Sequence, residues 1–175
     1  MVNNAGTISG GEYFEIDPSH IQRDMKVDLL TIFIINRILV PRLREREHNR
    51  SAIINMSSST GCYLSSFLGV YSSVKKSVDI YSRILSLDNS DKIDVISVRP
   101  FGVGTGMLRM KKGNVIFIVN PRECVSGVLA DLLGGETTTW SHLSHKMGSS
   151  LVYASLNEEQ AFVTYEKAWT TLFES

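Results

Sequence analysis

The chain has no excess of charge of either sign, because 18 Lys and Arg residues balance 18 Asp and Glu residues over 175 positions. A nucleic-acid-binding surface needs a basic face or stripe. The most basic segment, residues 42–50, contains interspersed acidic residues, which is typical of the solvent-exposed end of a helix. We therefore expect no nucleic-acid partner.

Cysteine and histidine are also scarce. The two cysteines, Cys62 and Cys124, have no spacing typical of a metal site or a disulfide framework. Two unpaired thiols are expected in a reducing compartment. Among the four histidines, His142 and His145 are close in sequence but have no third residue of ligand type nearby. We therefore expect no metal site.

No apolar run is long enough to cross a membrane. The longest, residues 29–40, is interrupted by Asn36 and Arg37 and is shorter than the ~20 residues that a span needs. The N-terminus has no basic stretch followed by an apolar core and a cleavage site, so no signal peptide is predicted. The residues alone leave the localisation open. The chain instead opens directly into residues 1–6, which have the pattern of the end of a buried strand, and a domain rarely starts inside its own sheet.

Caps and apolar periodicity predict the helices. Asp17 is suited to cap a helix and Pro18 to occupy its first turn. One face of that helix is expected to carry, at alternating spacings of four and three, Ile21, Met25, Asp28, Ile32, Ile35 and Leu39. Further helices are expected over about residues 68–87, from the cap at Asn120 to the Gly134–Gly135 stop, and over residues 156–172.

Short apolar runs between these helices predict strands. They lie near Val2 and over residues 52–56, 93–98 and 137–143. Strands that alternate with helices imply a parallel sheet covered on both faces. The fold class is therefore α/β, with about four parallel strands flanked by helices. No repeat, low-complexity stretch or linker divides the chain, so we expect a single domain.

Tyr71 and Lys75 lie four residues apart, which places them on one face of the predicted helix. A phenol with an ordinary pKa of about 10 is a poor acid–base catalyst at neutral pH. A fixed ammonium beside it favours the phenolate and lowers that pKa. Such a pair can exchange a proton with a carbonyl or alcohol oxygen. Taken alone, the same spacing is common in surface pairs.

Ser58 strengthens the catalytic interpretation. It follows the strand at residues 52–56, and sites in open α/β sheets gather beyond the carboxyl ends of strands. It also lies thirteen residues before Tyr71. A hydroxyl here could donate a hydrogen bond to a substrate carbonyl. The alternative is ordinary turn chemistry, because residues 57–61 have the composition of a loop.

Four segments in this order resemble the short-chain dehydrogenase/reductase family. They are Asn3-Asn4-Ala5-Gly6, Ser58, the Tyr71/Lys75 pair, and Pro100-Phe101-Gly102-Val103-Gly104-Thr105. The resemblance covers residues 1 to about 108. It implies an oxidoreductase that uses NADP or NAD and reduces a ketone to an alcohol by a Ser-Tyr-Lys mechanism.

The same resemblance implies the roles of individual residues. Ser58 would orient the substrate, Tyr71 would be the general acid/base, and Lys75 would lower the tyrosine pKa and hold the nicotinamide ribose. Asn4, with Ala5 and Gly6, would lie against the adenosine side of the cofactor. The loop that begins at Pro100 would hold the nicotinamide carboxamide through its backbone and threonine, with Val103 and Thr105 as contact residues.

Two further segments narrow the branch of the family. Phe101 is an aromatic where most members have glycine, and residues 138–149 resemble the end of the hydroxysteroid dehydrogenase and very-long-chain 3-oxoacyl-CoA reductase group. That resemblance implies a lipid-like substrate, either a long acyl thioester or a steroid ketone, and usually NADPH. It also implies membrane association at the endoplasmic reticulum through a segment upstream, and it allows a homo-oligomer.

Asp28 departs from the family pattern. The family usually has an asparagine at this position, where it holds a water molecule in the proton relay, so Asp28 joins the expected catalytic residues. It is the one acidic residue on the predicted apolar stripe. A buried carboxylate needs a partner or a shifted pKa. The alternative is a substitution tolerated because the site has decayed.

The family's glycine-rich turn, which brings the cofactor pyrophosphate to a helix N-terminus, is not in this sequence. Residues 6–11 lack the GxGxxG spacing and follow a different strand. At about 30 residues per βαβ unit, the resemblance implies that two N-terminal units are missing. Residues 1–175 would then be the C-terminal part of one domain with an incomplete Rossmann-type sheet, and residues 1–4 would form an exposed sheet edge.

Three functions follow from these features. We favour a truncated form of an active reductase. The alternatives are a catalytically inactive remnant that binds another protein through its exposed edge, and a small enzyme that is complete in itself. The sequence gives neither the substrate nor the choice between NADH and NADPH, because the residues that choose the cofactor phosphate usually follow the family's second strand.

Overall fold

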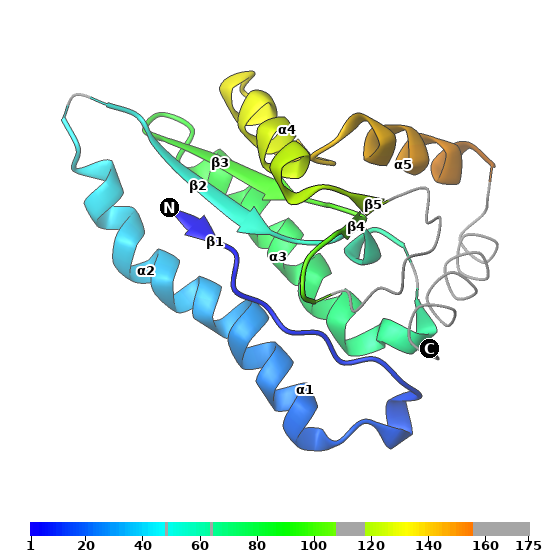
Figure 1. The fold of residues 1–175 in the computed structure, drawn as a ribbon. Helices are drawn as coiled ribbons and strands as arrows, with labels where there is room; N and C mark the ends of the chain where they lie inside the picture. The colour runs from blue at the N-terminus through cyan, green and yellow to red at the C-terminus, as the bar shows by residue number, and fades with distance from the viewer. Residues whose placement is uncertain (48, 64, 108–117, 156–175) are drawn as a thin grey trace.

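The computed structural model of the chain describes residues 1–47, 49–63, 65–107 and 118–155. Its main sheet has four parallel strands in the order β1 (Val2–Asn3), β2 (Ser51–Met56), β3 (Ile93–Val98) and β6 (Thr138–Thr139) (Figure 1). The predicted parallel sheet of about four strands is confirmed. Strand β1 lies at the edge of this sheet, where the sequence placed it, and Val2 is 61% exposed.

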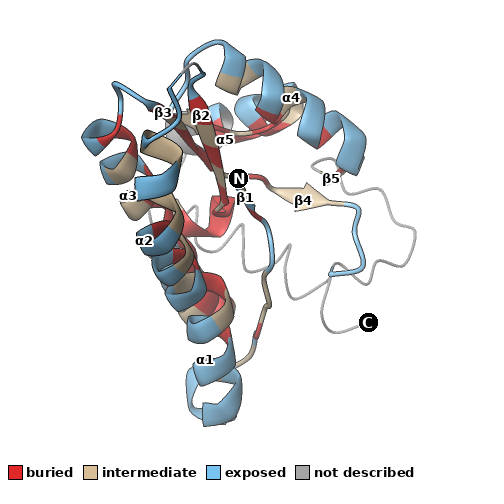
Figure 2. Cartoon of the chain, turned by 90° about the vertical axis from the view of Figure 1, so that its left-hand side faces the viewer, coloured by how far each residue is buried: buried red, intermediate tan, exposed pale blue. Residues whose placement is uncertain are grey.

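Helices cover both faces of the sheet. On one face lie α1 (Pro18–Met25), a π-helical segment (Lys26–Leu30), α2 (Thr31–Arg44) and α3 (Gly69–Asp88), and α4 (Pro121–Leu133) covers the other face (Figure 2). The remaining elements are 3-10 turns at Tyr13–Glu15, Ser59–Gly61 and Ser66–Leu68, the short pair β4 (Gly102–Val103) and β5 (Ile118–Val119), and α5 (Leu143–Ser155).

The predicted helix caps are present. The Asp17 carboxylate accepts a hydrogen bond from the Ser19 N–H at 2.7 Å. The Asn120 side chain accepts from the Arg122 N–H at 2.9 Å, and the Glu123 carboxylate accepts from the Asn120 N–H at 3.3 Å. Each cap satisfies backbone donors that have no partner inside the helix. Local sequence therefore sets where α1 and α4 begin.

The first helical stretch differs from the prediction in one respect. Its fully buried side chains are spaced by four, at Asp24, Asp28, Ile32 and Asn36. Met25, predicted on the buried stripe, is 49% exposed. In an ordinary α-helix, side chains spaced by four residues move gradually around the helix axis. The wider π turn offsets this rotation and keeps the four side chains on one face. The stripe therefore carries two buried carboxylates, where the sequence predicted one.

The C-terminal part contains the other corrections. The strand predicted at residues 137–143 pairs only at Thr138–Thr139, because the chain turns at Ser141 (φ 66°) and enters α5, which was not predicted. A Cβ atom on Gly127 of α4 would collide with the Ser141 carbonyl oxygen, so α4 and this turn are in direct backbone contact. The helix predicted over residues 156–172 lies outside the described residues.

The core lies between β2, β3 and the helices that pack on them. Ile53, Ile93 and Val95 form a buried cluster, and each is at most 2% exposed. Met1, Val40, Leu43 and Leu85 pack against it. None of the described helices combines the length and the apolar composition that crossing a membrane requires.

We expect Ile53→Ala to lower the free energy of unfolding by about 2–5 kcal/mol, because it leaves a cavity in the centre of the sheet. Chemical denaturation of the 175-residue chain measures this change. The matched control is Ile84→Ala on α3, where the side chain is 51% exposed and the cost should be within about 0.5 kcal/mol. Equal losses in the two variants would contradict this description of the core.

Candidate active site

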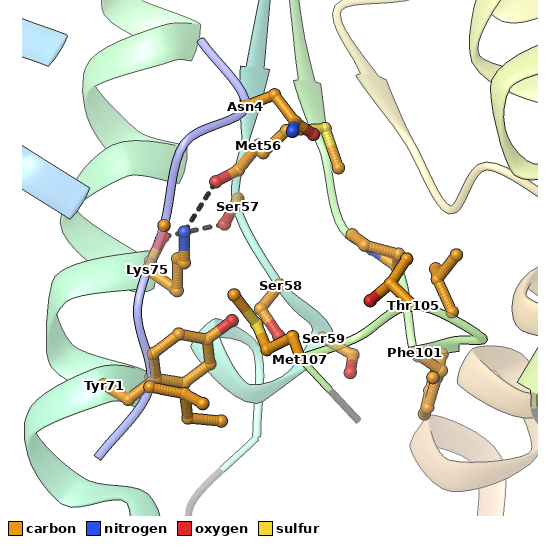
Figure 3. A pocket seen from close by; sticks show the side chains of 15 residues that line it. Asn4, Met56, Ser57, Ser58, Ser59, Tyr71, Lys75, Phe101, Thr105 and Met107 are labelled. Carbon is orange, nitrogen blue, oxygen red and sulfur yellow. Dashed lines mark hydrogen bonds between the residues drawn. The ribbon is translucent and has the colours of Figure 1, made fainter. Parts of the chain in front are cut away.

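The candidate site is a cavity of about 240 Å³ beyond the carboxyl ends of β1, β2 and β3 (Figure 3). This is the edge at which open α/β sheets bind ligands. Ser58 enters from the loop after β2, Tyr71 and Lys75 from α3, and Thr105 from the loop after β3. The lining residues are Asn4, Gly6, Ile8, Met56, Ser57, Ser58, Ser59, Tyr71, Lys75, Pro100, Phe101, Gly102, Val103, Thr105 and Met107.

The structure thus brings together most of the residues singled out from the sequence. Ser58, Tyr71 and Lys75 line one cavity, as do Asn4 and Gly6 from the N-terminal segment. Pro100, Val103 and Thr105 line it too, and Thr105 lies across the cavity from Lys75 (Figure 3). Ala5 does not line the cavity and its residue is exposed.

Ser58 occupies a fixed position at the end of β2. It caps the 3-10 turn Ser59–Gly61, and its hydroxyl oxygen lies 3.0 Å from the Thr60 Oγ1 and 3.3 Å from the Thr60 N–H donor. Its hydroxyl also lies near that of Tyr71 and lowers the Tyr71 pKa. The turn chemistry foreseen as an alternative is therefore real, and it coexists with placement beside Tyr71.

Helix α3 is held against the same loop by three contacts. The Ser57 hydroxyl donates to the Lys75 carbonyl oxygen at 2.7 Å, and the Lys75 Nζ donates to the Met56 carbonyl oxygen at 3.0 Å (Figure 3). A Cβ atom on Gly61 would lie 2.8 Å from the Lys76 nitrogen and 3.0 Å from the Lys75 carbonyl carbon. Only glycine allows this approach, which brings the loop that carries Ser58 close to the helix that carries Tyr71.

Asp28 reaches the site through Lys75. Its Oδ1 lies 2.7 Å from the Lys75 Nζ, and its side chain is fully buried while that of Lys75 is 5% exposed. The other carboxylate oxygen accepts from the Thr7 N–H at 2.8 Å and from the Thr7 hydroxyl at 3.0 Å. The buried carboxylate therefore has the partners that the sequence argument required.

A second buried carboxylate, Asp24, was not singled out from the sequence. The Thr7 hydroxyl donates to its Oδ1 at 2.7 Å, and the Arg23 guanidinium binds the same oxygen at 3.1 Å. Arg23 also donates to the Ser9 hydroxyl at 2.9 Å. The spacing of four residues between Asp24 and Asp28 could have indicated that both lie on the buried face. The predicted stripe follows alternating spacings of four and three, and this pattern does not include Asp24.

The environment of Tyr71 sets its protonation. Burial raises the pKa of its hydroxyl above the ordinary value, and the nearby Asp28 carboxylate raises this pKa further. The Ser58 hydroxyl lowers the pKa, and Asp24 makes a smaller increase. The Lys75 ammonium lies 5.4 Å from the centre of the Tyr71 ring. At neutral pH this hydroxyl is a proton donor.

Phe101 anchors the loop after β3. Its ring packs against Trp140 with 5.7 Å between centroids and against His145 with 5.4 Å. The fully buried His145 also accepts a hydrogen bond from the Phe101 N–H at 3.4 Å. The aromatic noted at this position thus fixes the far wall of the cavity. Among the described residues, no group of three or more His, Cys, Asp or Glu side chains could hold a metal ion.

Comparison with known proteins identifies the family. A sequence model described as "short chain dehydrogenase" matches residues 1–115, and the chain therefore belongs to the short-chain dehydrogenase family. Among curated relatives, the very-long-chain 3-oxoacyl-CoA reductase-B of Danio rerio is 30% identical over 151 residues, which cover 83% of this chain and 47% of that protein. The Homo sapiens very-long-chain 3-oxoacyl-CoA reductase is 27% identical and is covered over 49% of its length.

Solved structures show the same fold. A short chain dehydrogenase from Burkholderia cenocepacia in complex with NADP superposes with a TM-score of 0.75 at 24% identity, over 88% of this chain and 63% of that one. A 7beta-hydroxysteroid dehydrogenase gives a TM-score of 0.77 at 20% identity, over 94% and 64%. The chain spans about half the length of the first curated relatives or less.

We expect Gly61→Ala to destabilise the protein by about 1–3 kcal/mol, because the added methyl group collides with backbone atoms of α3 that cannot move independently. Thermal and chemical denaturation measure the loss. Gly69→Ala is the matched control, since an added Cβ there meets nothing within 4 Å. If Gly61→Ala is as stable as Gly69→Ala, the loop and the helix are not in the close contact described here.

Proposed function

We propose that this chain provides the catalytic part of an NAD(P)-dependent reductase that converts a ketone to an alcohol. The observation that carries the proposal is the convergence of Ser58, Tyr71 and Lys75 on one cavity. Membership of the family and the reductase names of its relatives agree with this reaction. Since the chain covers 47% of the Danio rerio relative, we infer that residues 1–175 are the C-terminal part of one domain.

Each of the three side chains has a distinct task in the proposed reaction. The Tyr71 hydroxyl donates its proton to the carbonyl oxygen as the alcohol forms. The Ser58 hydroxyl would orient that oxygen. Lys75 would hold the ribose of the cofactor. An ammonium has three N–H donors, of which one bonds the Met56 carbonyl oxygen while Asp28 is the ion-pair partner, so donor capacity remains for a ribose hydroxyl.

The residues around the cavity fit the nicotinamide end of the cofactor. Lys75 and Tyr71 lie across the cavity from Thr105 (Figure 3), Pro100 and Val103 also line it, and Thr105 is exposed. Asn4 lines the cavity at the end of β1 and would face the adenosine side. When bound, NADPH or NADH supplies the hydride for the carbonyl carbon.

The proposed substrate is lipid-like, a long-chain 3-oxoacyl thioester or a steroid ketone. The curated relatives carry the first name and one structural relative the second. Apolar side chains of Ile8, Met56 and Met107 line the cavity and suit such a chain. A homo-oligomer and membrane association at the endoplasmic reticulum belong to the same proposal.

A second candidate is a protein-interaction module without catalysis. It is favoured by strand β1, which pairs on one side only among the described strands and exposes Val2. An edge strand of this kind can accept a strand from another chain. Two measurements separate the candidates, the activity of a Tyr71 variant and the binding of the cofactor.

In the complete encoded protein, Tyr71→Phe should remove nearly all ketone reduction, because the proposed reaction takes its proton from the Tyr71 hydroxyl. Loss of general acid catalysis alone costs about 10²–10⁴-fold. Turnover of a 3-oxoacyl thioester with NADPH measures the effect. The control is Tyr13→Phe, whose side chain lies outside the cavity and whose residue is 70% exposed. Turnover of Tyr71→Phe near that of the control would refute the assignment.

The 175-residue chain alone should not bind either cofactor at micromolar concentration. Its sequence lacks the glycine turn whose N–H groups hold the pyrophosphate, and each lost charge-assisted hydrogen bond is worth about 1.5–3 kcal/mol. Losing several weakens binding by roughly three decades or more. Calorimetric titration with NADPH and NADH measures this. Saturable micromolar binding with ketone-dependent oxidation would instead support an enzyme that is complete in these residues.

A further inference from the structure

The ammonium beside Tyr71 already has a carboxylate partner. Lys75 Nζ lies 2.7 Å from Asp28 Oδ1 and 5.4 Å from the Tyr71 ring centre. A lone ammonium at this place would favour the phenolate. A carboxylate in contact with it turns the single charge into a dipole, whose field is far weaker at Tyr71. Both side chains are almost fully buried, so water screens this interaction very little.

Asp28 is bound as a charged group. Lys75 contacts one carboxylate oxygen, and the N–H and hydroxyl of Thr7 contact the other. An ion-pair partner on one oxygen and hydrogen-bond donors on the other suit the ionised carboxylate. One helical turn earlier, Asp24 has the Thr7 hydroxyl and the Arg23 guanidinium on its Oδ1, and its Oδ2 has no hydrogen-bond partner among the described residues. Each of the two buried carboxylates, Asp24 and Asp28, therefore has its own cation, Arg23 and Lys75 respectively.

The other groups around Tyr71 do not restore a net positive charge. The loop after β2 contributes the Ser58 hydroxyl, and β3 is followed by Arg99, which is paired with Asp79 at 2.6 Å. The charged groups that act on the Tyr71 hydroxyl are Asp28 and, more weakly, Asp24, and the cations in contact with these carboxylates are Lys75 and Arg23. As described, each cation in this set has an anion in contact.

We propose that Asp28 is a positioning residue that neutralises Lys75, keeps Tyr71 protonated, and so commits the site to reducing ketones over oxidising alcohols. This inference rests on the proposed function. In reduction the C=O π bond breaks, the carbon gains a C–H bond from the hydride of the reduced cofactor, and the oxygen gains an O–H bond from the Tyr71 proton. In oxidation the alcohol proton must pass to a Tyr71 phenolate, the form that the ion pair disfavours.

The direct test is the ionisation of Tyr71 in the 175-residue chain, without cofactor or substrate. Tyrosinate absorbance is recorded against pH, and the same titration of a Tyr71→Phe chain is subtracted to isolate this residue. Asp28→Asn keeps the size of the side chain and an oxygen for the Thr7 N–H while it removes the charge. We expect it to lower the midpoint of Tyr71 by about one pH unit or more, which gives about tenfold more phenolate at a pH below both midpoints.

The control is Asp88→Asn, which removes an exposed carboxylate at the far end of α3 and should leave the midpoint unchanged. Circular dichroism checks that each variant is folded. If Asp28→Asn does not fold, Asp24→Asn decides, with a smaller shift in the same direction expected. An unchanged or higher midpoint in the folded variant overturns the inference, because a purely structural carboxylate would not change the ionisation of Tyr71.

The second measurement compares the rates of the forward and reverse reactions. In the complete encoded enzyme, Asp28→Asn should raise the ratio of kcat for alcohol oxidation to kcat for ketone reduction, each at saturating substrates and neutral pH, about tenfold, in line with the larger phenolate fraction. The ratio of the two kcat/KM values is fixed by the equilibrium constant of the reaction and is not the readout. A kcat ratio that stays at the wild-type value overturns the inference even if the midpoint moves. The two proposals fail separately. An active Tyr71→Phe enzyme refutes the reductase, whereas an unchanged Tyr71 midpoint refutes only the role of Asp28.

Discussion

The ion pair between Asp28 and Lys75 is the interaction on which the site depends. Two charges buried this deeply are tolerated only with close partners, and their partners come from four parts of the chain. Thr7 belongs to the segment after β1, Asp28 to the π turn, Lys75 to α3, and Met56 to the end of β2. Satisfying the charges therefore requires all four segments to meet at one place. Removing either partner leaves an uncompensated buried charge, which costs about 3–5 kcal/mol.

Much of this arrangement could be predicted from local signals. Asp17 and Asn120 mark helix starts through their own backbone chemistry, and Tyr71 and Lys75 share a helix face by spacing alone. The meeting of Ser58 with Tyr71 follows from the rule that parallel strands end at one edge. These predictions succeeded because each depends on a few neighbouring residues or on a general property of parallel sheets.

The rest depends on contacts that sequence patterns do not encode. The π turn at Lys26–Leu30 and the burial of Asp24 arise from packing against Thr7 and α3. The apolar periodicity predicted that Met25 would be buried, whereas Asp24 is the buried residue. Strands β4 and β5 are two residues each, too short for any alternation to show. Ala5 was grouped with Asn4 and Gly6 by motif, although it is not among the residues that line the cavity.

The contact between Gly127 and the turn at Ser141 limits how this protein can change. The carbonyl oxygen of Ser141 occupies the space that any side chain at position 127 would need, and Phe101 rests on Trp140 and His145 beside that turn. In a variant with alanine at position 127, the turn after β6 would have to shift, together with the loop that forms the outer wall of the cavity. A glycine on the opposite side of the sheet from Tyr71 thereby constrains the shape available to the substrate.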